Sequence, residues 1–336
     1  MSLRVVTNYK LAGTRSFRLA ASMLFGLFGM NLQNPGKDEM DMMEAPYGYS
    51  IVQADQAGAE ALAVAYLARP GRYRALFQCG IKPHTFLAMH IFADRWKFPA
   101  PGRDWFLSAE PAELVKHPKW KEFSDQIAES GNPYAIGKRT AHGKSYRMGP
   151  KTYRLANLKQ SDGMLVLTHA ECVRFLSFFD KLFPEVIEWQ AEIETQIRAD
   201  RVLYNLQGFY RRFERNLTDD YIREGISWIP QSSIGCITHT ALKVTDDYIR
   251  ANDRDWSICS NKHDSYACIV PDAEVIECGR HMRAQLAQTF TGRDGVEFTM
   301  GSEVQVGKNW KPAKRKKDGT WSNPGGMRTV DLDMAA

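Results

Sequence analysis

The chain has 336 residues, of which 44% are hydrophobic and 25% are charged. This composition excludes intrinsic disorder and fibrous repeats and leaves room for about two domains. The net charge of +5 comes from 44 basic and 39 acidic residues, and five of the basic residues lie in the segment 311–317, which contains no acid. The remainder is balanced at 39 against 39, so a nucleic-acid surface must be a local groove and not a globally basic face.

The cysteines and the apolar segments indicate the compartment. The six cysteines contain no C-x-x-C pair, which argues against a disulfide framework or a structural zinc site and suits a reducing cytosol. No apolar run approaches the roughly 18 residues that a membrane span needs. The most hydrophobic stretch, 19–30, is followed by NLQNPGKDE and not by a small-residue cleavage site. We therefore expect a cytoplasmic protein without a membrane partner.

The hydrophobic pattern predicts a sheet that carries a helical insertion. Residues 47–54 form a short buried strand, and the stretch from Glu60 to Ala68 has helical periodicity. Further helices are expected at 83–95, 111–130 and 134–148, with one or two across 163–200. The second half predicts a hairpin over 201–214 that turns at Gln207-Gly208, a helix over 218–251, a hairpin at 256–270, a helix at 272–290 and a last strand near 297–307. The segment from 311 onward is polar and basic, which predicts a mobile tail.

Two aspartates stand where predicted strands end or turn. Asp55 follows the strand in SIVQADQAGAE, and Asp264 lies at the hairpin tip of WSICSNKHDSYACIVPD. Taken alone, Asp55 fits a helix N-cap and Asp264 fits ordinary turn chemistry. As a pair on neighbouring strand ends they fit a site for two Mg²⁺ ions about 3.5–4 Å apart, the arrangement used for in-line phosphoryl transfer.

A third segment, NPYAIGKRTAHGKSYRMG, places polar side chains at helical spacing. Tyr134, Lys138, His142 and Tyr146 recur every four residues, so a helix would align them on one stripe. A cation, an imidazole and two phenols on one face fit a surface for triphosphate, sugar and base. The alternative is an ordinary amphipathic helix whose polar groups face solvent. Gly149-Pro150 is expected to end this helix.

Five segments, in this order along the chain, carry a shared resemblance. The first segment, TRSFRL…NLQNPGK, is similar to T-G-R-L…N-L-Q-N, and the second, QADQAGAEALAVAYLA, is similar to D-Y-S-Q-I-E-L-R (motif A). The third, KRTAHGKSYRMG, is similar to K-x-x-x-F-G-x-x-Y-G (motif B). The fourth, REGISWIPQSSIG, is similar to R-x-x-x-N-x-x-x-Q, and the fifth, KHDSYACIVP, is similar to a segment with H-D-E (motif C). Between motifs A and B, Lys82-Pro83-His84-Thr85 is similar to D-I-H-T. The set resembles the polymerase region of family A DNA polymerases, the bacterial polymerase-I-like and phage enzymes.

The resemblance implies an α+β fold in which an antiparallel palm sheet with flanking helices carries a mostly helical fingers insertion. It assigns 1–60 and 216–310 to the palm, 61–215 to the fingers and 311–336 to a basic flexible tail. The family's thumb and exonuclease domains lie upstream of the arginine matched by Arg18, so we expect this chain to lack them, with a separate chain as one possible source. The family also implies a bacterial or phage-infected host cell.

The resemblance further implies the site residues of a template-directed DNA polymerase. Asp55 and Asp264 would hold two Mg²⁺ ions, with the main-chain carbonyl of Gln56 as a further ligand, and Lys138 would neutralise the triphosphate and act as a general acid toward pyrophosphate. The deoxynucleoside triphosphate would also contact Glu60, His142, Tyr146 and His84. Glu60 is expected beside Tyr146, under the sugar, where it would exclude a 2′-hydroxyl. Primer-template DNA would contact Arg18, Arg223, Ser227, Gln231 and His263.

Four positions depart from the family pattern and keep alternatives open. Ser265 stands where the family usually has Glu, Ser227 where it has Asn, His142 where it has an aromatic ring, and Tyr134 where an arginine would assist the triphosphate. His-Asp-Ser also occurs in phage-type single-subunit RNA polymerases, which is the first alternative; Glu60 opposes it. The second is a non-catalytic DNA-binding subunit of a split polymerase, which the joint presence of Asp55, Asp264 and Lys138 opposes.

Overall fold

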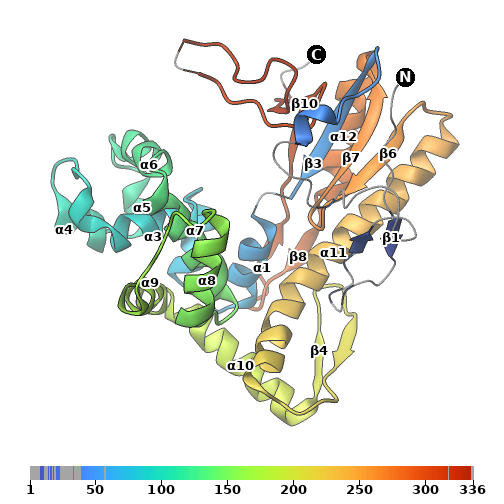
Figure 1. The fold of residues 1–336 in the computed structure, drawn as a ribbon. Helices are drawn as coiled ribbons and strands as arrows, with labels where there is room; N and C mark the ends of the chain where they lie inside the picture. The colour runs from blue at the N-terminus through green and yellow to red at the C-terminus, as the bar shows by residue number, and fades with distance from the viewer. Residues whose placement is uncertain are drawn as a thin grey trace.

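The structure is a computed structural model that describes residues 8–10, 14, 16, 18, 20–22, 33, 39–56, 58–316 and 318–333. Of the predicted motif positions, Asn31, Leu32, Asn34 and Lys317 lie outside these residues. Figure 1 shows a sheet with its covering helices on one side of the molecule and a helical lobe on the other. This arrangement is the predicted α+β fold.

A five-stranded antiparallel sheet forms the platform, with the strand order β11-β10-β3-β7-β6. Its strands are β3 (Tyr49–Asp55), β6 (Ser257–Asn261), β7 (Ser265–Pro271), β10 (Glu303–Gly307) and β11 (Arg328–Thr329). Three two-stranded pairs lie outside it: β1 (Asn8–Lys10) with β2 (Ala20–Ser22), β4 (Val202–Tyr204) with β5 (Tyr210–Arg212), and β8 (Thr289–Thr291) with β9 (Glu297–Thr299). The central strands β3 and β7 come from chain segments more than 200 residues apart, so the sheet joins the two ends of the sequence.

Alternation along β3 and β7 gives each face of the sheet its own core. Val52 and Ala54 are fully buried in the main core, where α11 (Asp219–Ala251) and α12 (Val275–Leu286) cover the sheet. On the opposite face, Ile51 and Ala267 form a small second core with side chains from the end of the chain. Both faces are therefore covered, and the site must lie at a sheet edge or strand end.

The segment after β10 covers the second face. Trp310 and Met327 are buried in the second core, and Leu332 is buried in the main core. Strand β11 pairs with β10 at Gln305↔Thr329 and Val306↔Arg328. The described part of this segment therefore differs from the mobile tail that its composition predicts, because apolar side chains at long intervals anchor an otherwise polar chain.

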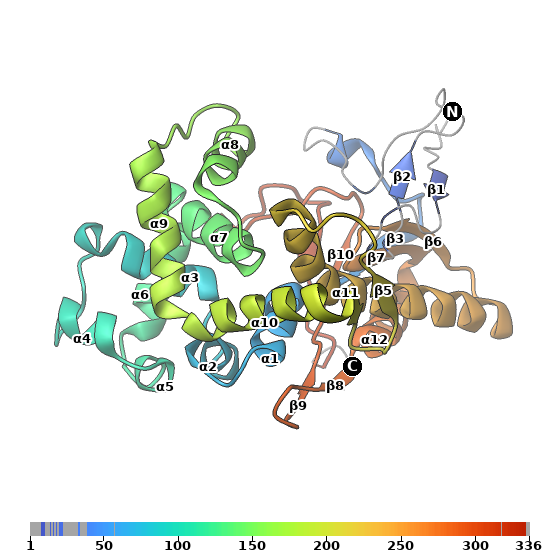
Figure 2. The ribbon, with the colours of Figure 1, turned by 90° about the horizontal axis from the view of Figure 1, so that it is seen from below.

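The helical lobe is inserted between β3 and α11, and Figure 2 shows α10 running from it toward α11 and the β4–β5 hairpin. Its helices are α1 (Ala59–Leu67), α2 (Arg72–Gln78), α3 (Pro83–Ile91), α4 (Arg103–Ser108), α5 (Pro111–Leu114), α6 (Trp120–Ala128), α7 (Asn132–Ser145), α8 (Pro150–Gln160), α9 (His169–Leu182) and α10 (Pro184–Asp200). Three short 3₁₀ turns are η1 (Met40–Met42), η2 (Ala93–Arg95) and η3 (Asp272–Glu274).

The predicted elements are present, and their boundaries differ for identifiable reasons. The helix expected at 111–130 is two helices, α5 and α6, and 163–200 holds α9 and α10, with Pro184 opening the second. The helix expected to reach 148 ends at Ser145, because Arg147 adopts a left-handed conformation with φ 57°. The amide of Met148 then donates to the carbonyl of Gly143 and that of Arg147 to Lys144, which closes a Schellman motif.

Further along the chain, α12 begins only at Val275 and ends at Leu286, within the predicted 272–290. The strand expected near 297–307 is divided into β9 and β10. No helix formed by the described residues is long and apolar enough to cross a membrane.

Candidate active site

The pairing of β3 with β7 brings the two predicted catalytic aspartates together. Asp55, the last residue of β3, is paired with Ser265, the first residue of β7, and Asp264 directly precedes that pair. The ladder continues one step further, because the amide of Gln56 donates to the main-chain carbonyl of Asp264 at 2.9 Å. Two residues separated by 209 positions in the sequence thus lie next to each other where the paired strands β3 and β7 terminate.

Asp55 is not a helix cap, because α1 starts after Gly58, which takes the N-cap position in a left-handed conformation. Burial raises the pKa of Asp55, although a hydrogen bond from the Ser265 side chain opposes this shift. Burial, together with the negative charge of Asp55, raises the pKa of Asp264 to about 6. Low solvation destabilises both charged carboxylates, and a negative neighbour adds to this effect: Glu303 acts on Asp55, and Asp55 acts on Asp264. A bound cation relieves such an electrostatic environment.

The donor set fits Mg²⁺ with substrate completing the coordination. Asp55 and Asp264 offer hard carboxylate oxygens. Among the residues that the structure describes, no group of three or more His, Cys, Asp or Glu side chains could hold a metal ion. The two carboxylates would therefore need main-chain, water or phosphate oxygens, as Mg²⁺ sites in phosphoryl-transfer enzymes do. Within the described part of the chain, the carbonyl of Gln56, the predicted further ligand, accepts only a long bond of 3.4 Å from the amide of Ala59.

Glu60 lies in the first turn of α1 and links Arg18 to the end of α7. The hydroxyl of Tyr146 donates to one carboxylate oxygen at 2.6 Å, and the guanidinium of Arg18 binds the other. Burial alone would raise the pKa of Glu60, but Arg18 and Tyr146 outweigh it, so the pKa is lowered and the group is ionised at neutral pH. The sequence predicted that Glu60 lies beside Tyr146, and the structure places them in direct contact.

His263 and Gln56 are both hydrogen-bonded to the same residue of helix α11, Thr238. His263 adopts a left-handed conformation with φ 63°, and its carbonyl accepts a hydrogen bond from the hydroxyl of Thr238 at 2.9 Å. The same hydroxyl accepts a bond from the Gln56 side-chain amide at 2.8 Å. Thr238 therefore ties the ends of β3 and β7 to one point of α11. Sequence reasoning missed this residue, because nothing in its helical context marks it.

The predicted DNA-contacting residues of α11 recur every four positions. Arg223, Ser227 and Gln231 consequently lie on one stripe of the helix and are all partly exposed. The guanidinium of Arg223 pairs with Asp220, and the hydroxyl of Ser227 donates to the carbonyl of Glu224 at 3.1 Å. Further along α11, a β-carbon at Gly235 would lie 3.5 Å from Cγ of Arg18, so Arg18 lies against the same helix.

Helix α7 presents the third predicted group. The side chains of Lys138 and His142 are exposed on its surface, and Tyr146, expected as a fourth helical residue, is the C-cap. Lys138 makes no hydrogen bond or ion pair with another residue that the structure describes, yet it is close enough to lower the pKa of Asp55. The charge of Lys138 therefore acts within electrostatic range of the Asp55 carboxylate.

A close helix contact fixes the position of α7. A β-carbon at Gly137 would lie 2.4 Å from the carbonyl of His84 on α3, so only glycine allows this approach. On the same side, His84 Nε2 is 2.7 Å from the hydroxyl of Tyr134. Burial and the nearby Lys138 lower the pKa of His84 to about 4, so its ring is neutral at neutral pH. Tyr134 is therefore engaged with His84.

Lys262 is a second residue that sequence reasoning missed. Its ammonium lies 4.2 Å from the ring centroid of Trp310, and its charge acts on both Asp55 and Asp264. Trp310 itself donates to the side chain of Gln53 on β3 at 2.5 Å. A lysine directly before His-Asp at the tip of a predicted hairpin was the available signal. Its partner Trp310 comes from the end of the chain and could not be anticipated.

Comparison with known proteins gives a match of fold. No family model and no curated protein matches the chain. Among solved structures, the POL domain of Pol1 from M. smegmatis, in complex with DNA primer-template and dNTP, is similar with a TM-score of 0.67 and 17% sequence identity. The similarity covers 92% of this chain and 48% of that chain, so this chain spans about half the length of that structure. The chain therefore has a polymerase-like α+β fold.

Proposed function

We propose that the chain is the core of a template-directed DNA polymerase that adds deoxynucleotides to a primer 3′ end. The observation that carries this proposal is that β3 ends where its partner β7 begins, which brings Asp55 beside Asp264, with the charge of Lys138 acting on Asp55. The similar structure supports the choice of partners, because it was solved with primer-template and dNTP. In this assignment residues 1–60 and 216–310, which include β3, β6, β7, β10, α11 and α12, are the palm, and 61–215 are the fingers.

The chemistry follows from the charges of the site. When bound at Asp55 and Asp264, two Mg²⁺ ions would supply Lewis-acid stabilisation of the charge that develops in phosphoryl transfer. Lys138 would stabilise the negative charge of the triphosphate and give a proton to the departing pyrophosphate. Ser265 would hold Asp55 in its orientation through the bond to its carboxylate.

The sugar preference rests on Glu60. Its carboxylate is fixed by bonds to Arg18 and Tyr146, so it has little freedom to move aside for a larger sugar. A 2′-hydroxyl placed against this carboxylate would lose its hydration and would clash with a side chain that cannot move away. This supports deoxynucleotides over ribonucleotides and speaks against the RNA-polymerase alternative.

The stripe of α11 would contact the duplex. Arg18, His263, Arg223, Ser227 and Gln231 would meet the minor groove near the primer terminus. Acceptors occur there on every base pair, so such contacts test the geometry of the pair without selecting a sequence. Arg223 would have to exchange Asp220 for DNA, which an exposed ion pair permits at little cost.

Primer extension tests the proposal directly. The purified chain is incubated with a labelled primer-template, Mg²⁺ and either deoxy- or ribonucleoside triphosphates. We expect extension with deoxynucleotides only, and none after chelation of the metal. Extension with ribonucleotides alone would establish the RNA-polymerase alternative, and DNA binding without any extension would establish the non-catalytic subunit.

A further inference from the structure

The β4–β5 hairpin presents an aromatic and basic surface that the proposed chemistry does not use. Its exposed side chains include Tyr204, Phe209 and Tyr210, with 58%, 55% and 56% of their surface accessible. Large apolar side chains are normally exposed singly, so three within seven residues mark an interaction surface. The hairpin lies beside α11 at the base of the molecule in Figure 1.

The register of the hairpin places the rings and a cation on one face. Tyr204 is directly opposite Tyr210, and Val202 is opposite Arg212, so alternation puts these side chains on the same outward side. The two tyrosine rings are 6.2 Å apart, and the guanidinium of Arg212 lies 6.0 Å from the ring of Tyr210. Leu203, on the other side, is fully buried, and this inner side fixes the hairpin to the protein.

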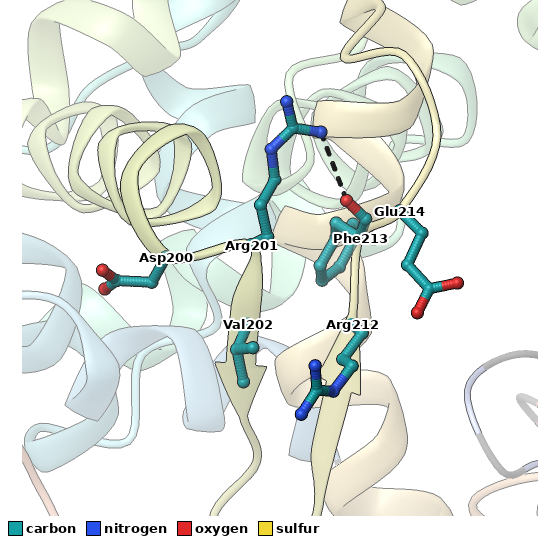
Figure 3. Close-up of a pocket in the computed structure, with 6 residues that line it drawn as sticks. All are labelled: Asp200, Arg201, Val202, Arg212, Phe213 and Glu214. Atoms are coloured by element: carbon teal, nitrogen blue, oxygen red, sulfur yellow. Dashed lines mark hydrogen bonds between the residues drawn. The ribbon is translucent and has the colours of Figure 1, made fainter.

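A hollow of about 400 Å³ continues this face at the root of the hairpin. Figure 3 shows Val202 and Arg212 facing each other across the two strands, with Arg201 bound to the carbonyl of Phe213. Residues 200–215 contain four arginines and two acidic residues, a local charge of +2, and one of the arginines, Arg211, is paired with Glu224. A phosphate backbone is the ligand that complements such a surface.

The turn of the hairpin is held rigidly next to the proposed duplex path. The side chain of Asn205 accepts bonds from the amides of Gln207 and Phe209, and the Gln207 side chain donates to the carbonyl of Ser233 on α11 at 3.0 Å. Ser233 is two positions from Gln231. It is five positions from Thr238, the residue that holds the catalytic strand ends, or about 8 Å along the helix axis.

We propose that this outward face, formed by Tyr204, Tyr210 and Arg212 with Phe209 at the turn, binds the unpaired template strand by stacking its bases on the aromatic rings. Paired bases expose only their edges, so exposed rings favour unpaired nucleotides, and Arg212 on the same face would contact the phosphates. The identity of the strand as template rests on the proposed function. The stacking surface itself rests on the hairpin alone.

Fluorescence anisotropy with three labelled DNAs tests the proposal: a single strand of about 20 nucleotides, a blunt duplex of similar length, and a primer-template with an unpaired overhang. Tyr204→Ala combined with Tyr210→Ala should weaken binding of the single strand by about tenfold or more. Binding of the primer-template with the overhang should weaken as well, and binding of the blunt duplex should be unchanged. Tyr204→Phe with Tyr210→Phe keeps the rings and should bind normally.

Two further variants make the test independent of folding defects. Tyr47→Ala removes a fully exposed tyrosine outside the hairpin and should have no effect on any of the three DNAs. Arg212→Gln should lower the log–log salt dependence of single-strand binding by about 0.7. Unchanged single-strand binding in the double alanine variant, or an equal loss on the blunt duplex, would overturn the proposal.

Primer extension by the unmodified chain separates this inference from the proposed function. If the chain extends primers and the hairpin variants bind every DNA normally, the inference alone fails. If the hairpin variants lose single-strand binding and the unmodified chain extends nothing, the surface stands as a single-strand site and the polymerase assignment fails.

Discussion

The two halves of the candidate site differ in how many of their polar groups are already bonded within the chain. At the sheet edge, Asp55, Gln56 and His263 are held by the β3–β7 ladder, by Ser265 and by Thr238. On α7, Lys138 and His142 are exposed on the helix surface. We call the first group (Asp55, Gln56 and His263, with Asp264) the fixed half and the second (Lys138 and His142) the open half. The fixed half suits ions that must keep one geometry through the reaction, and the open half suits a ligand that arrives and leaves.

Glu60 lies between these halves and is bonded to both. Arg18, which lies against α11, and Tyr146, at the end of α7, share its carboxylate. Changes in the fixed half should therefore abolish chemistry, changes in the open half should reduce it, and changes at the junction should alter selectivity.

The largest expected effect is in the fixed half. Asp264→Asn keeps the shape of the side chain and removes the charge that a metal ion needs, so extension should fall by about 10³-fold or more. Binding of primer-template, measured by anisotropy, should persist. Asp253→Asn, at an exposed turn, is the matched control. Activity of Asp264→Asn within about tenfold of the unmodified chain would rule out this carboxylate as a metal ligand.

Lys138→Met tests the open half. The side chain keeps its length and loses the charge that would stabilise the triphosphate, so the extension rate should fall by about 10²-fold. The fold should be unaffected, because the ammonium has no partner among the described residues. Lys116→Met, also at an exposed lysine, controls for net charge. Equal rates for the two variants would show that α7 does not contact the nucleotide.

Glu60 tests the junction. Glu60→Ala removes the group beneath the proposed sugar position, so ribonucleotide use relative to deoxynucleotide use should rise by about ten- to a hundredfold. Glu60→Gln keeps the volume and should retain most of the discrimination. The measurement is single-nucleotide incorporation with matched triphosphates. A rise of equal size in both variants would assign selectivity to the charge of Glu60 instead of its bulk.

The difference between the halves also explains what the sequence could predict. Asp55 and Asp264 follow strong strand patterns, so their convergence could be anticipated from an antiparallel sheet. The stripe Tyr134, Lys138 and His142 follows from helical spacing. The end of α7 was misplaced, because the left-handed conformation of Arg147 depends on how Met148 packs and no glycine marks it.

Residues that act through long-range contacts remained hidden. Thr238 is unremarkable within α11 until β3 and β7 meet it, and Trp310 acquires a role only when the chain end folds back over the sheet. Both contacts depend on tertiary placement that local periodicity does not encode. The same is true of the C-terminal segment, whose polar composition suggested mobility while two distant apolar residues, Trp310 and Met327, anchor it.

The smallest expected effect is on stability, at the contact between α3 and α7 that positions the open half. The pKa of His84 falls from 6.5 to about 4 on folding, because burial and Lys138 disfavour its charged form. Between pH 6.5 and 4 the unfolded chain therefore binds more protons than the folded chain, and stability is lost as the pH falls through this window. Allowing for partial exposure, the loss attributable to His84 is about 1–2 kcal/mol.

The free energy of unfolding, measured by urea titration at neutral pH and near pH 5, checks this expectation. His84→Gln cannot be protonated in this range and should show a smaller loss of stability on acidification than the unmodified chain. His169→Gln, at the exposed start of α9, should leave the pH dependence unchanged. If the free energy of unfolding falls by the same amount on acidification in His84→Gln and in the unmodified chain, the ring of His84 is solvated in the folded protein. Its bond to Tyr134 then does not hold α7 in place.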